Sequence, residues 1–198
     1  MNATEIHRLR DAVHSAYSAA AERPQDPHPF PVGRLFAESL GYPRDLLDGL
    51  PSVSVDAFAG VSNLALLAEI PAGATVLDLG CGAGLDSLIA AQRVGPEGRV
   101  VGLDFSEVML ARARQGAAEL GYANVEFCHA DAEDLPIEDG SIDVALVNGL
   151  FNLNPDRVAI FRGLTRAVRP GGHVYAAELI LREPAPADTE FDETSWFA

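Results

Sequence analysis

The residues of this sequence best suited to chemistry lie in a glycine-rich turn after an apolar run. Val76-Leu77 leads into Asp78-Leu79-Gly80-Cys81-Gly82-Ala83-Gly84. Glycines let the backbone approach a ligand, and a turn between a buried strand and a helix is where α/β sheets bind nucleotide-like ligands. The G-x-G-x-G spacing departs from the G-x-G-x-x-G fingerprint of dinucleotide-binding proteins, which disfavours a nicotinamide-dependent oxidoreductase. Tight packing between elements also needs glycine, so the loop alone leaves a purely structural role open.

Two acidic residues follow the next two predicted strands. Asp104 ends the run Val100-Val101-Gly102-Leu103, at a separation from the glycine loop that suits hydrogen bonds to ribose hydroxyls. Asp131 follows Phe127-Cys128-His129 and offers an acceptor for an exocyclic amine, although it also suits a helix cap. The carboxyl ends of parallel strands meet at one edge of a sheet. The loop and the two acids therefore indicate one site for a nucleotide-like ligand.

The elements that must position these residues alternate between short β-rich and helical runs. We expect strands at 75–79, 99–104, 125–129, 142–148 and 173–181, and helices at 86–94, 106–120 and 155–168. Such alternation predicts parallel strands joined by right-handed crossovers, with helices on both faces of the sheet. The expected fold class is doubly wound, Rossmann-like α/β with a mainly parallel sheet.

A helical cap is expected ahead of this core. Residues 6–20 space their apolar side chains three or four apart, and further helices are expected at 32–40 and 56–70. Four prolines within residues 24–31 interrupt the first helix and form a connector. The domain prediction is a cap or lid at 1–70, a ligand-binding core at 71–182 and an irregular tail at 183–198.

Composition limits the classes of function. The chain has 198 residues, is 48% hydrophobic and carries a formal charge of −15. Every basic residue is Arg and none forms a run, which argues against nucleic-acid binding by phosphate neutralisation. No apolar run reaches the roughly 20 residues that cross a bilayer, so no membrane partner and a cytoplasmic location are expected. Cys81 and Cys128 form neither a disulfide framework nor a zinc-ligand cluster, and no metal site is expected.

Four motifs together resemble class I S-adenosylmethionine-dependent methyltransferases. They are the glycine loop, Asp104-Phe105-Ser106-x-x-Met109, Ala130-Asp131-Ala132-Glu133-Asp134-Leu135-Pro136 and Arg169-Pro170-Gly171-Gly172, within about residues 75–181. The resemblance implies S-adenosylmethionine as the cofactor and a small-molecule substrate. It implies that the cofactor-binding residues are Asp78, Gly80, Cys81, Gly82, Gly84, Asp104, Phe105, Met109, Asp131, Ala132 and Asn148.

The resemblance also implies how these residues act. The loop glycines contact the methionine part of the cofactor, and Asp104 holds the ribose. Phe105 and Met109 pack near the adenine, although ordinary core packing explains them equally well. Asp131 and the backbone of Ala132 read the amino edge of the adenine. Asn148, at the end of the fourth strand, lines the floor of the site near the methyl group.

The resemblance narrows to the arsenite methyltransferase-related branch through Gly41-Tyr42-Pro43, Asn63 and residues 148–153. In that branch, cysteines that hold trivalent arsenic stand just ahead of the position matching Asn63 and where Gly149 stands. Here the two places are occupied by Val61 and Gly149, and neither replaces the thiolates that soft arsenic prefers. We expect methyl transfer to a small organic molecule. A non-catalytic S-adenosylmethionine-binding protein and an arsenite methyltransferase-like enzyme are the alternatives.

Catalytic residues are not assigned by the sequence. Transfer from a sulfonium needs an in-line approach and exclusion of water, and a general base is optional. His129, His173 and Glu178 are candidates if the acceptor is a hydroxyl or a carbon acid. Tyr17 is expected either over the methionine end of the cofactor or in the core of its helix.

The family sheet continues past its fifth strand with a helix and an antiparallel hairpin, whereas seventeen residues follow Leu181 here. We therefore expect a shortened carboxyl-terminal end with the fifth strand at the sheet edge. Either the tail or a second subunit in a homodimer is expected to cover that edge.

Overall fold

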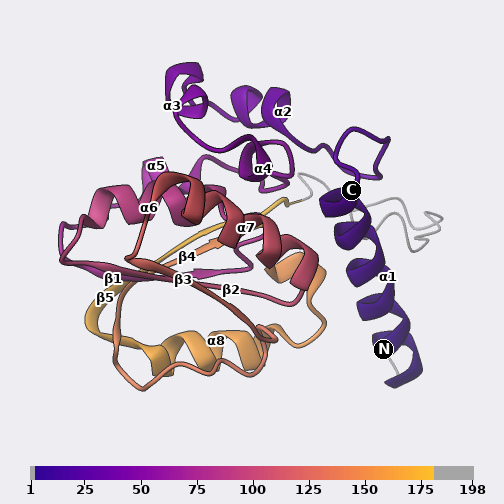
Figure 1. Ribbon diagram of the computed structural model, residues 1–198. Helices are drawn as coiled ribbons and strands as arrows, with labels where there is room; N and C mark the ends of the chain where they lie inside the picture. Colours follow the sequence, from indigo (N-terminus) through magenta and orange to yellow (C-terminus); the bar gives the residue numbers. More distant parts are fainter. Residues whose placement is uncertain (1–2, 181–198) are drawn as a thin grey trace.

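The computed structural model describes residues 3–180 and shows a five-stranded parallel sheet between layers of helices (Figure 1). The strands lie in the order β3-β2-β1-β4-β5, and every neighbouring pair is parallel. The order reverses at β1, and ligands of such sheets bind outside the carboxyl ends of the strands at this point. The five strands are β1 (Thr75–Leu79), β2 (Arg99–Asp104), β3 (Val125–His129), β4 (Ile142–Asn148) and β5 (Val168–Ala177).

Helices cover both faces of the sheet, as the sequence predicts. Helices α6 (Leu85–Val94) and α7 (Glu107–Leu120) lie on one face and α8 (Arg157–Ala167) on the other (Figure 1). All but the first residue of β1 and of β2 are buried, which explains why these strands are apolar runs without alternation. A short 3-10 helix, η1 (Phe151–Leu153), connects β4 toward α8. The doubly wound α/β prediction is confirmed.

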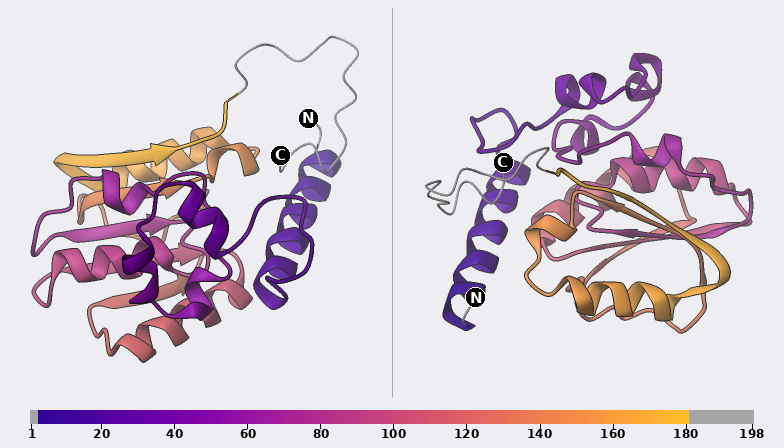
Figure 2. Two further views of the ribbon diagram at one scale, coloured as in Figure 1. Left: turned by 90° about the horizontal axis from the view of Figure 1, so that it is seen from above. Right: turned by 180° about the vertical axis from the view of Figure 1, so that it is seen from behind.

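Five helices form the amino-terminal region. Helix α1 stands beside the sheet, and the shorter helices lie above the layer formed by α6 and α7 (Figures 1 and 2). Contacts join α1 and α4 to α7, and α5 to α6 and β4. The five are α1 (Ala3–Glu22), α2 (Arg34–Ser39), α3 (Arg44–Asp48), α4 (Ser52–Val55) and α5 (Leu64–Leu67).

Two predicted elements differ from the structure. The helix expected at 56–70 is absent; α4 ends before it and α5 occupies only its middle, because the intervening backbone hydrogen bonds to Asn148 instead. The fifth strand begins at Val168 rather than at 173. Ile142 pairs with Val168 and Val144 with His173, so the Arg-Pro-Gly-Gly segment is a bulge inside the strand. Proline is tolerated at such a bulge. Leu181, its predicted end, lies outside the described residues.

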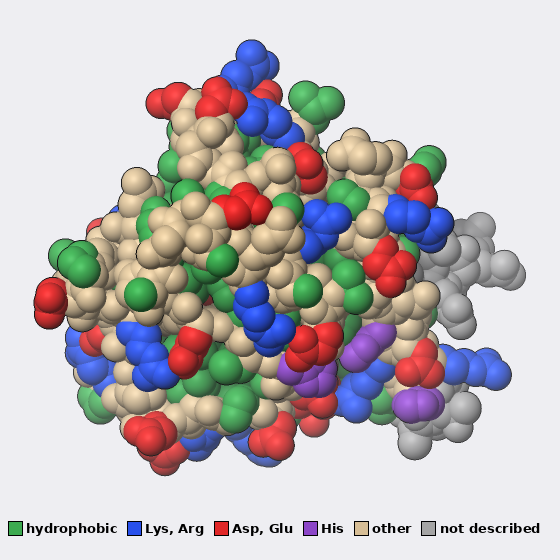
Figure 3. Space-filling view, viewed as in Figure 1, with side chains coloured by type: hydrophobic (Ala, Val, Ile, Leu, Met, Phe, Trp, Pro, Cys, Tyr) green, Lys and Arg blue, Asp and Glu red, His purple; other side chains and the backbone are tan. Residues whose placement is uncertain are grey.

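Among residues 3–180, β5 pairs with β4 alone. Its predicted cover by the tail concerns residues outside the described part, and cover by a second subunit stays a prediction. No described helix combines the length and apolarity that crossing a membrane requires. On the face shown in Figure 3, basic side chains are interspersed with acidic ones and form no continuous basic area.

The packing of α8 against the sheet generates a stability prediction. Ile160 is fully buried, whereas Val158 on the same helix is 58% exposed. We expect Ile160→Ala to lower the free energy of unfolding by about 2–5 kcal/mol, because it leaves a cavity beneath the helix. Val158→Ala, the matched control, should change it by less than about 0.5 kcal/mol. Urea unfolding followed by circular dichroism measures both, and equal losses would contradict this packing.

Candidate functional site

Two cavities adjoin at the carboxyl edge of the sheet. One follows the glycine loop and is named the loop cavity; the other follows the chain after β3, at 130–133, and is named the outer cavity. The outer cavity is also lined by residues of α1. The residues common to both linings are Gly80, Asp104, Phe105, Leu150 and Leu153. The two cavities are therefore neighbours with a common wall that includes Asp104.

Ten of the eleven predicted cofactor residues line these cavities. Gly84 lines neither: it precedes α6, and a Cβ there would lie 2.9 Å from the Cβ of Ala113, so its role is close packing against α7. The predicted residues of the loop cavity are Asp78, Gly80, Cys81, Gly82, Asp104, Phe105, Met109 and Asn148. Those of the outer cavity are Gly80, Asp104, Phe105, Asp131 and Ala132.

The glycine loop is held against the end of β2. The backbone N–H groups of Gly80 and Cys81 both donate to the carbonyl of Leu103. Gly80 has φ +77°, and a Cβ there would lie 2.9 Å from Leu150 Cδ1. The thiol of Cys81 is buried, which raises its pKa well above the usual value and keeps it protonated. Cys81 therefore belongs to the loop as a buried, protonated thiol.

Asp104 is fixed by two backbone donors. Its Oδ2 accepts from Gly82 N at 2.8 Å and its Oδ1 from Ser106 N at 2.8 Å. Burial raises the pKa of Asp104 to about 6, against the opposing effect of these hydrogen bonds. Each carboxylate oxygen keeps a further lone pair, so the rigidly held group can accept from ligand hydroxyls.

Two further buried acids line the loop cavity. Burial and the neighbouring charge of Asp86 raise the pKa of Asp78 to about 8, and Ser87 donates to its Oδ2. Burial also raises the pKa of Asp86, which accepts from Tyr42, the backbone of Ala65 and Asn148. Within the described part of the chain, no Arg side chain lines this cavity. A positive charge on a ligand would lower the raised pKa values of these two acids and of Asp104, so the cavity suits a positively charged ligand group.

Asn148 lines the loop cavity, but its amide is used by the protein. Its Oδ1 accepts from Val61 N at 2.9 Å and Ser62 N at 3.1 Å, and its Nδ2 donates to Ser62 O and Asp86 Oδ2, both at 2.8 Å. This amide holds the 61–62 segment against the end of β4. Asn148 is therefore a positioning residue for the cavity wall.

The structure brings none of the three candidate bases into either cavity. His129 and His173 are exposed on their strands. Glu178 is half-buried, which raises its pKa, and its carboxylate accepts from Phe151 N at 2.7 Å and Asn152 N at 3.3 Å. The carboxylate of Glu178 therefore fixes the start of η1. Tyr17 does line the loop cavity, and burial raises its pKa, so it stays a proton donor.

Helix α1 contributes three residues that the sequence did not single out, in addition to Tyr17, which it did. Arg10, Val13 and His14 line the outer cavity, and Tyr17 lines the loop cavity. The His14 ring stacks on Phe105 with centroids 3.9 Å apart, and burial lowers the pKa of His14. The i, i+3, i+4, i+7 spacing of these four residues places them on one face of a helix. The spacing does not indicate which surface that face packs against.

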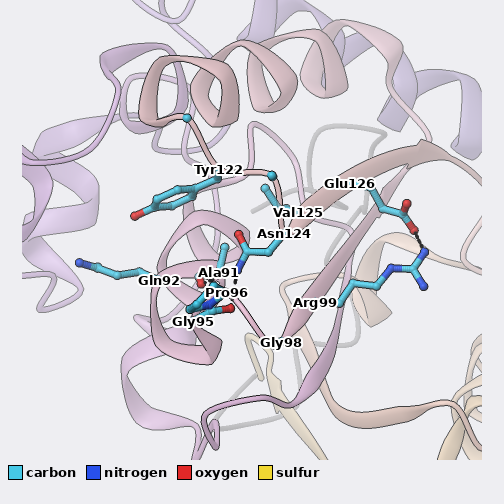
Figure 4. Close-up of a pocket in the computed structure, with 12 residues that line it drawn as sticks. Ala91, Gln92, Gly95, Pro96, Gly98, Arg99, Tyr122, Asn124, Val125 and Glu126 are labelled. Atoms are coloured by element: carbon cyan, nitrogen blue, oxygen red, sulfur yellow. Dashed lines mark hydrogen bonds and ion pairs between the residues drawn. The ribbon is translucent and has the colours of Figure 1, made fainter.

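A larger cavity, of about 680 Å³, lies at the opposite edge of the sheet (Figure 4). Three of its polar side chains have partners in the chain: Asn124 donates to the carbonyls of Ala91 and Gly95, and Arg99 pairs with Glu126. It contains none of the predicted site residues. The described residues also contain no cluster of three or more His, Cys, Asp or Glu that suits a metal.

The two positions that carry cysteines in the arsenite-related branch lie side by side. A Cβ at Gly149 would stand 3.1 Å from Val61 Cγ1. Gly149 also has φ +79°, a left-handed conformation that side chains rarely adopt. The two positions where the resemblance expects cysteines are therefore in contact, but the contact is apolar and contains no sulfur atom.

Comparisons with known proteins agree with this geometry. Residues 70–196 match the methyltransferase domain family. The arsenite methyltransferase of Halobacterium salinarum is 37% identical over 159 residues, which are 80% of this chain and 40% of that protein. A demethylmenaquinone methyltransferase of Listeria monocytogenes is 40% identical over 109 residues, 54% of this chain and 46% of that protein.

A solved structure gives the same result. The crystal structure of an arsenic(III) S-adenosylmethionine methyltransferase from Chlamydomonas reinhardtii superposes with a TM-score of 0.57 and 28% identity. The superposition covers 75% of this chain and 49% of that one. The chain spans less than half the length of the two curated relatives described above.

The buried acids generate a prediction about pH. Because the folded state raises the pKa of Asp78 from 3.8 to about 8, it binds a proton that the unfolded chain releases between these values. The free energy of unfolding should therefore fall as pH rises through this window. Asp104 contributes a further decrease in the same direction, up to about pH 6. Asp78→Asn should flatten the dependence. Urea unfolding at several pH values tests it, with the exposed Asp139→Asn as control; an unchanged slope in Asp78→Asn would contradict it.

Proposed function

Because this chain belongs to the methyltransferase domain family, in the class I S-adenosylmethionine-dependent group, we propose that it binds S-adenosylmethionine and methylates a small organic molecule. The observation that carries the proposal is the position of Asp104 where the two cavities join. A ligand whose ribose lies at Asp104 has its amino-acid end in the loop cavity and its base in the outer cavity.

The lining fits the chemical parts of this cofactor. Asp78, Asp86 and Asp104 lie in a cavity whose described lining has no Arg. A sulfonium or an ammonium beside them would favour their ionised forms, and the cofactor carries both groups. Gly80 and Gly82, both with positive φ, leave the backbone uncovered along the loop. The fit concerns the charge of the lining and the backbone left open along the glycine loop.

When bound, S-adenosylmethionine supplies a methyl group that is already activated by the sulfonium. The residues of the chain then have to position the acceptor and keep water out. Phe58, Leu150 and Leu153 supply apolar lining at the loop cavity. Tyr17 retains its proton and is available as a hydrogen-bond donor at the same cavity. No side-chain base is required for this role.

An apolar organic acceptor is supported by the wall around Gly149. Val61 and Gly149 provide no thiolate, and Cys81 is held protonated by burial. Trivalent arsenic needs sulfur ligands, so these residues disfavour arsenite. Among the relatives, the demethylmenaquinone methyltransferases are named for an organic acceptor. We propose an acceptor of that general kind, with an apolar body.

Calorimetry tests cofactor binding. We expect binding of S-adenosylmethionine and S-adenosylhomocysteine and no binding of NAD. Asp104→Asn should weaken S-adenosylmethionine binding by about ten- to a hundredfold, because charged hydrogen bonds contribute about 1.5–3 kcal/mol. Asp139→Asn, at an exposed ion pair with Arg166, is the matched control. Binding of NAD without either adenosyl ligand would overturn the proposal.

A transfer assay tests the activity. Methyl-labelled cofactor is incubated with phenols, quinols, thiols, amines and arsenite, and labelled products are separated. We expect label in an organic product and none in methylated arsenic. Cofactor binding without transfer to any acceptor would favour the non-catalytic alternative, and methylated arsenic would overturn the assignment of the acceptor.

Introducing cysteines at positions 61 and 149 tests whether their absence is what prevents arsenic binding. A double variant with Val61→Cys and Gly149→Cys places two thiols next to each other. It should retain As(III) through gel filtration, whereas the wild type and each single variant should not. The cysteine at 149 adopts a left-handed backbone at a cost of about 1–2 kcal/mol, so thermal unfolding is measured in parallel. As(III) retained by the wild type would contradict the proposal.

A further inference from the structure

The two cavities of the candidate site are smaller than the ligand proposed for them. The loop cavity has a volume of about 70 Å³ and the outer cavity one of about 50 Å³. Pockets that bury a ligand of the cofactor's size measure about 300–1,000 Å³. A wall of the cavities must therefore move before such a ligand can enter. This step rests on the proposed function, because it takes the ligand to be S-adenosylmethionine.

Helix α1 is the wall whose displacement would open both cavities. Arg10, Val13 and His14 line the outer cavity and Tyr17 lines the loop cavity, and no other helix in the described amino-terminal region lines both. An ion pair between Arg10, whose side chain is 46% exposed, and Glu133 ties the first half of α1 to the core. Such partly exposed pairs contribute little to stability.

The shorter helices α2 to α5 are fixed in place. They share one buried apolar core with β1 and β4, and among the described residues of α1 none belongs to that core. Tyr42, before α3, is 2% exposed and donates to Asp86 of α6, and Arg93 of α6 donates to the carbonyl of Ala65 in α5. Moving these helices would break buried hydrogen bonds and expose apolar surface to water.

The connector after α1 contains a joint between these two parts. The ring of Phe30 stacks on Tyr17 of α1 with centroids 4.4 Å apart, so this end of the connector packs with α1. Gly33 N donates instead to the carbonyl of Phe58 at 2.8 Å, and Phe58 belongs to the fixed core. The chain therefore passes from one part to the other at 31–32.

Arg112 of α7 ties the end of α1 to the fixed part. Its Nε donates to the carbonyl of Ala21 in the last turn of α1, and its Nη1 donates to the carbonyl of Val53 in α4 at 3.1 Å. The last carbonyls of a helix have no partner within the helix, and the helix dipole also favours a cation there. A second tie lies one turn earlier, where the hydroxyl oxygens of Ser18 and Ser106 are 3.3 Å apart.

We propose that α1 alone is the gate for the cofactor: it turns about the joint at 31–32 while α2 to α5 stay in place, and Arg112 is the positioning residue that holds it closed. Closure brings Tyr17 to the loop cavity and His14 onto Phe105, and it keeps water out of the site. Opening of α1 then limits both entry and release of the ligand.

A disulfide between α1 and the start of α7 tests the gate. In the double variant with Ser18→Cys and Ser106→Cys the two thiols are close enough to be joined, and thiol titration verifies the bond. We expect the oxidised protein to take up labelled S-adenosylhomocysteine about a hundredfold more slowly than the reduced form of the same protein. Protein oxidised after loading should release the ligand equally slowly. Equal rates in the oxidised and reduced forms would overturn the gate.

Arg112→Leu tests the tie. Release of labelled S-adenosylhomocysteine, followed in a chase, should become about tenfold faster, because charge-assisted hydrogen bonds that hold α1 are lost. Arg114→Leu, the matched control on the same helix, removes bonds to the carbonyl of Phe127 and should leave the rate unchanged. In the disulfide-locked protein Arg112→Leu should have no effect on release. Faster release there as well would overturn its role in holding the gate.

Hydrogen exchange distinguishes the gate from the fixed part. In Arg112→Leu the amides of α1 should exchange faster than in the wild type, whereas those of α2 and α5 should be unchanged. Faster exchange in all three helices would overturn the division of this region at 31–32. A wild type that does not bind S-adenosylhomocysteine would overturn the proposed function, whereas normal binding at rates that ignore the lock would overturn the gate alone.

Discussion

The hydrogen bond between Asp86 and Asn148 joins the amino-terminal region to the sheet where the cavities form. Asp86 lies in the first turn of α6, Asn148 ends β4, and the two side chains meet at 2.8 Å. Through Tyr42, Ala65 and the 61–62 backbone they hold three segments that are distant in sequence. Removing either partner would leave buried polar groups unpaired. The free energy of unfolding would then fall by more than the contribution of a single hydrogen bond. The wall of the loop cavity therefore depends on this pair.

The same network explains the distribution of charge along the cleft. Asp86 satisfies its carboxylate with neutral donors, and so does Asp78, whose partner is Ser87. No Arg compensates these acids in the described lining of the loop cavity, whereas Arg10 does compensate Glu133 in the outer cavity. A ligand that is cationic at one end and neutral at the other matches this pattern. The cleft is thus oriented before any ligand enters, and reversing the ligand would place its charge beside Arg10.

The core was predictable from sequence because its signals are local. Four strands match their expected bounds, since each is a short apolar run between turn residues, and Ser106 caps α7 through Met109 N. The cap was not predictable in the same way. The 56–63 segment has the composition of a helix, but its backbone donors at 61 and 62 bond to Asn148, 86 or 87 residues away. No periodicity in the segment encodes that partner.

The residues of the candidate site also differ in whether local sequence signals predict them. The glycine loop and Asp104 lie in strand-end motifs, so their convergence followed from the parallel sheet alone. The contributions of Arg10, His14 and Glu133 depend on where α1 docks, which its helical spacing does not determine. The hydrogen bonds of Asn148 could not be predicted for a related reason. Its place at the end of β4 was foreseen, but not the four hydrogen bonds that use its amide.

The contact between Val61 and Gly149 makes the wall after β4 apolar at the two positions where the arsenite-related resemblance expects cysteines. Gly149 N donates to Ala177 O, so the left-handed turn after β4 is tied to β5, and a side chain at 149 would require Val61 to shift by a few tenths of an ångström. A cysteine at 61 alone gives a single thiol, which is too few ligands for trivalent arsenic. A cysteine at 149 alone meets the valine methyl. The two positions are therefore in packing contact, and an arsenic site at this wall would need changes at both.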